Sequence, residues 1–421
     1  MTSRERVRRV LNHQEADRVP VDLASTLVTG IQAGMYARLK KAMGITEGAI
    51  KVYDPFQMLA EVEEPVKQAL GVDTFGIQLP TTLFGYKNEN WKPFRLFDGT
   101  DVLISGHFEY DVLENGDIVQ YPKGDRRARP SGRMPKGGFY FDTIVRQEPI
   151  DEAKLDPKEW VEQTYSLYTE EELRFIEDTS QYYYNNSDYA LIGNFWGAGF
   201  GDIAIVPGPG ILDPKGIRDP QEWYMSTVTR KSYVKEIYQY QFELQMKNLE
   251  LYQQAVGDRI EVVVMSGTDF GSQNGPFISL AAYRELYKPL HTAMNDWVHQ
   301  HTNWKTFYHT CGSIVKFLDD FHEAGIDILN PVQISAKGMD PELLKTQYGD
   351  KFVFWGGAID VQHILPFSTP DVVHAEVSRN VNIFKSGGGF VFNNVHNIQS
   401  GIPVENLLAM FDALQANWSY Q

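Results

Sequence analysis

Short apolar runs recur along the chain at spacings that suit parallel β-strands separated by helices. In the second half of the chain these runs cover residues 189–195, 260–266, 305–309, 326–330, 352–356 and 389–395. Two earlier runs, at residues 19–23 and 72–79, bring the number of predicted strands to eight. Eight strands, each followed by a helix or a long crossover, predict one α/β domain over residues 1–421. Its predicted fold is a single (β/α)₈ TIM-type barrel, with a doubly wound sheet as the alternative.

Periodic apolar positions predict the helices between these strands. Thr2 or Ser3 can cap a first helix that carries Val7, Val10 and Leu11 at helical spacing, which gives an N-terminal helical extension. The other amphipathic patterns cover residues 31–43, 55–70, 220–256, 280–301, 313–324, 341–348, 370–384 and 404–416.

Residues 84–142 do not continue the alternation of strand and helix patterns. Short β-prone runs alternate there with the dipeptides Asp98-Gly99 and Asn115-Gly116, which are strong hairpin signals. A basic stretch from Arg126 to Arg129 follows. We expect a β-rich insertion in the barrel, and the pattern leaves open whether it is a lid, an interface or plain surface.

Composition narrows the class of protein. The formal net charge of −16 argues against nucleic acid or an anionic membrane as the main partner. The single cysteine excludes a disulfide scaffold and suits a reducing compartment. The first residues are polar and charged, and no apolar run reaches the roughly 20 residues that span a bilayer. We therefore expect a soluble cytoplasmic protein; a homo-oligomer stays among the options.

The segment His309-Thr310-Cys311-Gly312 stands where a predicted strand turns into a loop. Residues two apart on a strand point to the same face, so the His309 imidazole and the Cys311 thiol would converge. That donor pair suits a borderline-soft metal such as zinc. A buried cysteine beside a hydrogen-bonded histidine is the simpler interpretation, and the spacing alone does not decide between the two.

Polar residues at other strand ends would meet this pair, because the C-terminal strand ends of a barrel share one rim. His396 follows the last predicted strand and completes a predicted zinc site with an open position. Asp269 is predicted as a fourth, oxygen ligand or an orienting group, although it could simply cap the segment that follows. Tyr308 is the candidate acid. The candidate substrate-binding residues are Gln273, Asn330, Trp355 and Asn394.

Several stretches together resemble the uroporphyrinogen decarboxylase superfamily, and specifically its corrinoid-dependent methyltransferase branch. They are Thr268-Asp269-Phe270-Gly271-Ser272-Gln273, His309-Thr310-Cys311-Gly312-Ser313, residues 325–333, Phe354-Trp355-Gly356-Gly357, and residues 396–406. The resemblance implies a (β/α)₈ barrel whose zinc is held by a His-x-Cys pair and a further cysteine near the last strand. Here His396 stands where that further cysteine is expected. The decarboxylases also carry an Arg-Gln-Ala-Gly-Arg segment after the first strand, and this chain has Ser25-Thr26-Leu27-Val28-Thr29 instead, so uroporphyrinogen decarboxylation is not expected.

One thiolate and two neutral imidazoles leave zinc with a net charge of about +1, against neutrality for a two-thiolate site. The more positive ion is the stronger Lewis acid for an ether oxygen. We therefore predict a zinc-dependent methyltransferase of the O-demethylase type that takes the methyl group of a small donor, favouring a methoxyaromatic ether. The resemblance implies a cobalamin (corrinoid) cofactor, and because this chain shows no cobalamin-binding domain, a partner protein is expected to carry it. The alternatives are a thiol-methylating corrinoid methyltransferase and a metal-free decarboxylase or binding protein.

Overall fold

The computed structural model describes residues 1–420 and contains a curled sheet of seven parallel strands in the order β15-β14-β13-β12-β11-β10-β3. The strands are β3 (Thr74–Ile77), β10 (Ala190–Asn194), β11 (Val262–Ser266), β12 (Lys305–His309), β13 (Ile328–Asn330), β14 (Val353–Trp355) and β15 (Phe390–Val391). Each strand pairs in parallel with its neighbour. Each of these strands falls inside one of the predicted apolar runs.

Residues 19–23 close the sheet into a barrel between its two outer strands. Val21 forms a parallel bridge with Phe392, and the Asp22 backbone N–H donates to the Phe392 carbonyl at 2.9 Å. On the other side, the Asp73 N–H donates to the Val21 carbonyl at 2.8 Å. The predicted (β/α)₈ barrel is therefore confirmed, with its first strand reduced to a few bridging hydrogen bonds.

The barrel interior is a packed apolar core. Inward side chains come from alternate strand positions such as Val262 and Val264, and they meet Val7, Val10 and Leu11 of the first helix, which plugs the N-terminal end. Thr2 caps that helix as predicted, with Glu5 completing a capping box. Core packing of this kind stabilises the fold without help from any polar site at the other end.

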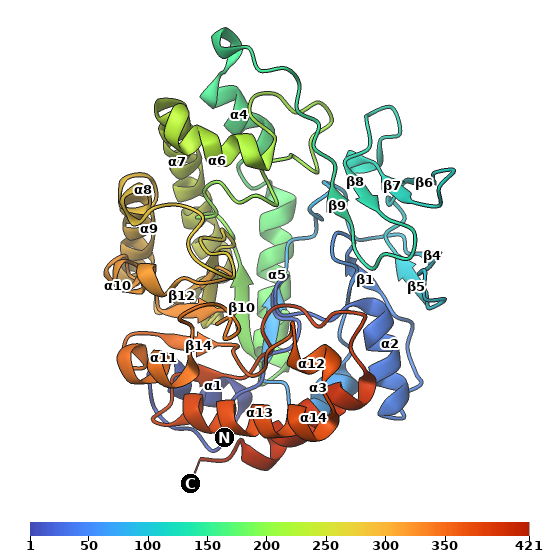
Figure 1. Ribbon diagram of the computed structural model, residues 1–421, viewed down its shortest axis with the longest axis vertical. Helices are drawn as coiled ribbons and strands as arrows, with labels where there is room; N and C mark the ends of the chain where they lie inside the picture. Colours follow the sequence, from blue (N-terminus) through green and yellow to red (C-terminus); the bar gives the residue numbers. More distant parts are fainter. Residues whose placement is uncertain (421) are drawn as a thin grey trace.

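Helices surround the sheet, and both chain termini lie at the same end of the molecule (Figure 1). None of the helices within residues 1–420 combines the length and the apolar character needed to cross a membrane. The helices are α1 (Ser3–Leu11), α2 (Ala33–Ala42), α3 (Glu64–Leu70), α4 (Pro157–Thr164), α5 (Glu170–Asn186), α6 (Pro220–Thr229), α7 (Lys231–Val256), α8 (Leu280–Leu286), α9 (Lys288–His301), α10 (Leu318–Glu323), α11 (Pro341–Tyr348), α12 (Ile364–Phe367), α13 (Pro370–Lys385) and α14 (Val404–Asn417).

The predicted helix at residues 55–70 is wrong over its first half. Asp54 accepts hydrogen bonds from the backbone N–H groups of Phe56 and Gln57, at 3.1 and 3.3 Å, so the chain turns directly after β1 (Val52–Asp54). It returns as β2 (Leu59–Ala60), and helix α3 starts only at Glu64. A side chain that bonds its own following backbone competes with helix formation, which the apolar spacing does not reveal.

The predicted β-rich insertion forms two small antiparallel sheets to one side of the barrel (Figure 1). One pairs β4 (Lys92–Arg95) with β5 (Asp101–Ile104); the other contains β6 (Tyr110–Val112), β7 (Ile118–Gln120), β8 (Gly132–Met134) and β9 (Asp142–Thr143). The arginines of the basic stretch are neutralised by nearby carboxylates: Arg126 by Glu109, Arg127 by Asp125 and Arg129 by Glu148, at 3.2, 2.7 and 2.8 Å. This pairing favours plain surface for the basic stretch.

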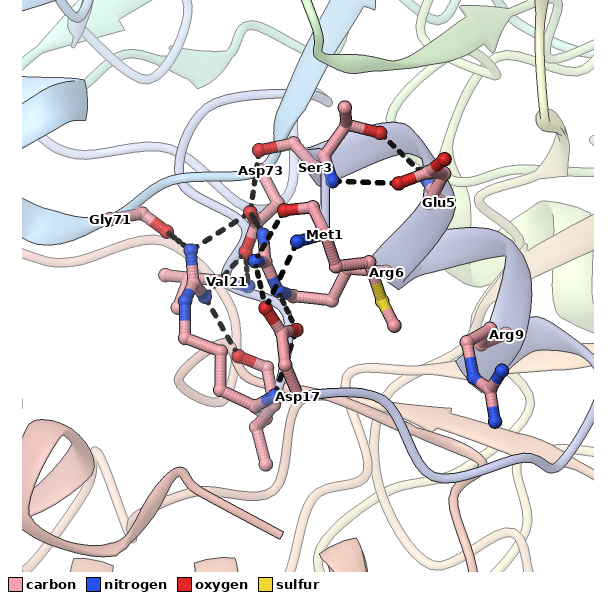
Figure 2. A network of polar contacts seen from close by, with 12 residues as sticks. Met1, Ser3, Glu5, Arg6, Arg9, Asp17, Val21, Gly71 and Asp73 are labelled. Atoms are coloured by element: carbon pink, nitrogen blue, oxygen red, sulfur yellow. Dashed lines mark hydrogen bonds and ion pairs between the residues drawn. The ribbon is translucent and has the colours of Figure 1, made fainter.

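A buried carboxylate fastens helix α1 to the base of the barrel. Figure 2 shows Asp73, whose side chain is fully buried, beside Ser3, Arg6 and Val21. Asp73 accepts hydrogen bonds from the Ser3 hydroxyl at 2.7 Å, from Arg6 at 2.6 Å and from the Val21 N–H at 2.8 Å. Arg18 adds two further bonds to the same carboxylate, at 2.7 and 3.0 Å. One side chain thus joins α1, the closing segment 19–23 and β3.

Candidate metal centre

Three potential ligand side chains converge at the C-terminal rim of the barrel. His309 is the last residue of β12, Cys311 lies two residues further on, and His396 follows β15. The ligand atoms of these residues all lie within 4.8 Å of one another, and the Cys311 Sγ is 3.4 Å from the His309 Nε2. The structure therefore brings the three predicted ligands together, while metal binding itself stays a prediction.

Local backbone geometry explains how Cys311 reaches this position. Gly312 has a φ of 85°, and a Cβ atom there would overlap the backbone carbonyl of Gly271. Only glycine permits so close an approach in this conformation, so the chain can turn away immediately after Cys311. The Cys311 N–H also donates to the Asp269 Oδ1 at 2.6 Å, which ties the turn to the loop after β11.

His309 is fixed in one tautomer by its neighbour Asn330. The Asn330 Nδ2 donates to the Trp355 carbonyl at 2.8 Å, so its Oδ1 must face the His309 Nδ1, which lies 2.6 Å away. The Nδ1 therefore carries the hydrogen, and the Nε2 lone pair points toward Cys311. Burial lowers the pKa of His309 to about 4, which keeps the ring neutral near pH 7. A neutral ring with a buried acceptor on its second nitrogen is the usual state of a metal-binding histidine.

His396 is held differently. Its backbone has a φ of 64°, and the Asn397 N–H donates to its Nδ1 at 2.8 Å. Burial, reinforced by the proximity of His309, lowers the pKa of His396 to about 3. The ring is therefore neutral: its Nδ1 accepts the hydrogen bond from Asn397, and its Nε2 carries the ring hydrogen. It can bind an ion through Nδ1 in place of the Asn397 bond, or through Nε2 once the ring hydrogen has moved to Nδ1.

The two acidic groups of the cluster have raised pKa values. Burial, and then the charge of Asp269, hold the pKa of the Cys311 thiol well above its usual range. Burial also raises the pKa of Asp269, whose Oδ1 lies 4.0 Å from the His309 Nε2. A bound metal cation would supply the positive charge that stabilises the Cys311 thiolate, which no cationic group of the cluster provides. One sulfur and two imidazoles at this spacing fit zinc.

Some predicted site residues support the cluster from behind. Asn330 orients His309 and is fully buried, so it offers no free amide to a substrate. Asn394 donates to the His396 carbonyl at 2.6 Å and is also buried. Trp355 lies inside the barrel, where its Nε1 donates to the Asp22 Oδ2 at 2.8 Å. The Asn330 amide, the Asn394 Nδ2 and the Trp355 Nε1 are thus engaged by the protein, and the role of these residues in substrate binding stays a prediction.

Tyr308 and Gln273 lie away from the three ligands. The Tyr308 hydroxyl donates to the Asn295 Oδ1 of helix α9 at 3.0 Å, on the outer face of β12. Residues 308 and 309 point to opposite faces of the strand, so the Tyr308 hydroxyl lies on the far side from the His309 ring, and its role as an acid stays a prediction. Gln273 donates to Gln362 at the edge of an open depression of about 730 Å³, which Lys337 and His363 also line.

Sequence reasoning missed Asp202 and Asn397. Asp202 lies on the glycine-rich loop after β10, and burial, together with the charge of Asp269, raises the pKa of Asp202 to about 7. Asn397 donates to Gln57 at 2.7 Å and to the Leu27 carbonyl at 2.9 Å, so it joins the loop of His396 to two other rim loops. The strand-end argument that selected Asp269 could have found both, because each follows a predicted strand.

The role of Asn330 can be tested by zinc titration. Asn330→Leu removes the acceptor that fixes His309, so we expect zinc affinity to fall by about 10- to 100-fold. Asn330→Asp keeps an acceptor for the Nδ1–H and should retain most of the affinity. Competition with a chelator of known zinc affinity measures both variants. If Asn330→Leu binds zinc as tightly as the wild type, Asn330 does not contribute to zinc binding through His309.

Known proteins resemble this chain in part of its sequence and in its fold. A family model described as uroporphyrinogen decarboxylase (URO-D) matches residues 231–416. A search of curated protein sequences finds no match. Among solved structures, a methyltransferase from Methanosarcina mazei is 13% identical over 99% of each chain, with a TM-score of 0.49. The resemblance to the uroporphyrinogen decarboxylase superfamily is thus confirmed over residues 231–416.

Proposed function

We propose that this chain, whose residues 231–416 match the uroporphyrinogen decarboxylase family, is a zinc-dependent methyltransferase that passes a methyl group to cobalamin on a partner protein. The favoured donor is a methoxyaromatic ether, which makes the reaction an O-demethylation. The convergence of His309, Cys311 and His396 within 4.8 Å at the C-terminal rim is the observation that carries the proposal. In this barrel fold, active sites lie at that rim.

The donor set supports an ether as substrate. When bound, zinc would supply a Lewis acid for the ether oxygen, and one thiolate leaves it more positive than two would. The depressed pKa values of His309 and His396, about 4 and about 3, mean that neither imidazole competes for the site as a cation near pH 7. The chain's own groups then set the geometry: Asn330 orients His309, and Asp269 holds the Cys311 backbone.

Trp196 is the aromatic side chain best placed to meet an aryl group. It is half-buried at the top of the barrel core, beside the start of the loop after β11. Phe270 and Tyr308, by contrast, are buried among the aromatic side chains of helices α8 and α9. A flat ring packed against Trp196 would lie at the rim that carries the three proposed ligands.

The test combines metal analysis with a transfer assay. We expect about one zinc per chain and methyl transfer to free cob(I)alamin, followed by the loss of its absorbance, from methoxyaromatics in preference to methylamines or methylthiols. Transfer from methylcobalamin to a thiol, with no activity on ethers, would favour the thiol-methylating alternative. A protein that binds no zinc and transfers no methyl group would overturn the proposal and favour the metal-free alternative.

A further inference from the structure

A second carboxylate, that of Asp202, lies at the rim on the loop that follows β10. Gly201 has a φ of 64°, and a Cβ atom there would overlap the Tyr238 hydroxyl, so the loop packs tightly against the helices just before Asp202. The Asp202 Oδ2 lies 3.0 Å from the position that a Cβ atom on Gly267 would occupy, and the Trp196 ring lies 3.2 Å from the same position. Gly267 directly follows β11, two residues before Asp269.

The environment of Asp202 differs from that of a structural carboxylate. Its Oδ1 accepts from the Ala204 N–H at 2.9 Å, while its Oδ2 accepts no hydrogen bond and no cationic side chain pairs with it within residues 1–420. The titratable groups that act on it electrostatically are the Asp269 carboxyl from the loop after β11, Tyr165 from the segment after α4 and Tyr224 from α6. None of these can stabilise a negative charge on Asp202 near pH 7.

The consequence is a carboxyl group that is partly protonated near neutral pH. Burial is the main cause that raises the pKa of Asp202 to about 7, and the charge of Asp269 adds to it. Carboxyl groups tuned in this way serve as general acids, provided that a protein atom does not already take their hydrogen. The free Oδ2 beside Trp196 meets that condition.

We propose that Asp202 donates the proton that the ether oxygen gains when its methyl group departs. The inference rests on the proposed O-demethylation. The bond between the methyl carbon and the oxygen breaks, and its electron pair stays on the oxygen. The new bond of the methyl carbon uses the electron pair of the reduced corrinoid that the partner carries. The proton passes from the Asp202 Oδ2 to the oxygen, which leaves as a phenol, and water returns a proton to Asp202.

A leaving-group series tests this role. Asp202→Asn cannot donate an acidic proton, so methyl transfer from an ether of a weakly acidic phenol should slow by roughly 100-fold or more. An ether of a nitrophenol, whose oxygen leaves without help, should be affected only slightly. Asp202→Glu should recover part of the lost rate. Asp213→Asn is the matched control, since Asp213 lies exposed on the same loop and pairs with Lys215 at 2.7 Å.

The pH profile is the second measurement. For the wild type we expect the rate with the weakly acidic phenol to fall as the pH rises through about 7, because the donor loses its proton there. The Asp202→Asn variant should lack this limb while keeping its zinc content and unfolding midpoint.

Two results would contradict the inference in different ways. Equal losses for all leaving groups, with the pH limb intact in Asp202→Asn, would overturn the role of Asp202 and leave the proposed function standing. A wild-type protein that transfers no methyl group from any ether would overturn the proposed function, and the role of Asp202 with it.

Discussion

Cys311→Ser should lose zinc and methyl transfer while the barrel stays folded. Cys311 is the only cysteine of the chain, so the substitution removes the only thiolate that a metal could use. A serine hydroxyl is nearly the same size but is a far weaker zinc ligand at neutral pH. The core inside the barrel does not involve residue 311, so the free energy of unfolding, compared between the two proteins in their zinc-free forms, should change by no more than about 1 kcal/mol.

Zinc content by mass spectrometry, transfer to cob(I)alamin and urea unfolding measure the three quantities separately. Thr310→Ser is the matched control, because it keeps the hydroxyl that accepts from the Phe270 N–H at 2.9 Å and leaves the sulfur in place. We expect this control to retain zinc and activity. Wild-type transfer rates in Cys311→Ser would show that the cluster is not the reaction centre.

Asp73→Asn should cause the largest loss of stability of any substitution considered for this chain. The change removes the negative charge between Arg6 and Arg18 in a fully buried position (Figure 2). Breaking one partner of a buried ion pair typically costs about 3–5 kcal/mol, because the remaining charge is left without compensation. Urea unfolding should show a lower midpoint with an unchanged slope.

The matched control for this prediction is Asp17→Asn. Asp17 pairs with the same Arg6 at 2.7 Å, but its side chain is 43% exposed. Solvent screens such a pair, so the loss should stay below about 1 kcal/mol. If the two variants are equally stable, burial of the Asp73 charge is not what secures α1 to the barrel.

The sequence predicts the barrel well because strand number and order depend on local patterns. The eight apolar runs contain the seven strands of the sheet and the closing segment around Val21. The convergence of His309, Cys311 and His396 also follows from topology, since the strand ends of a parallel barrel meet at one rim. Neither prediction depends on the contacts that individual side chains make in the folded protein.

The sequence does not reveal the hydrogen-bond partners of several candidate side chains, because those partners lie far away in the chain. Tyr308 is engaged by Asn295, and Trp355 by Asp22 across 333 residues. Asn330 was expected at a substrate, but its amide is shared between His309 and the Trp355 carbonyl. Asp202, by contrast, was not selected from the sequence. Its raised pKa comes from burial, which no local pattern of the glycine-rich loop reveals.

The bridge between Val21 and Phe392 has a consequence for how the chain is made. The two residues are 371 positions apart, so a ribosome adding about 5–20 residues per second needs roughly 20 to 75 seconds between them. Throughout that interval the segment 19–23 has one edge without its partner strand, and an unpaired edge is a template for wrong pairing. The edge of residues 19–23 therefore stays open to wrong pairing until the last strand has been made.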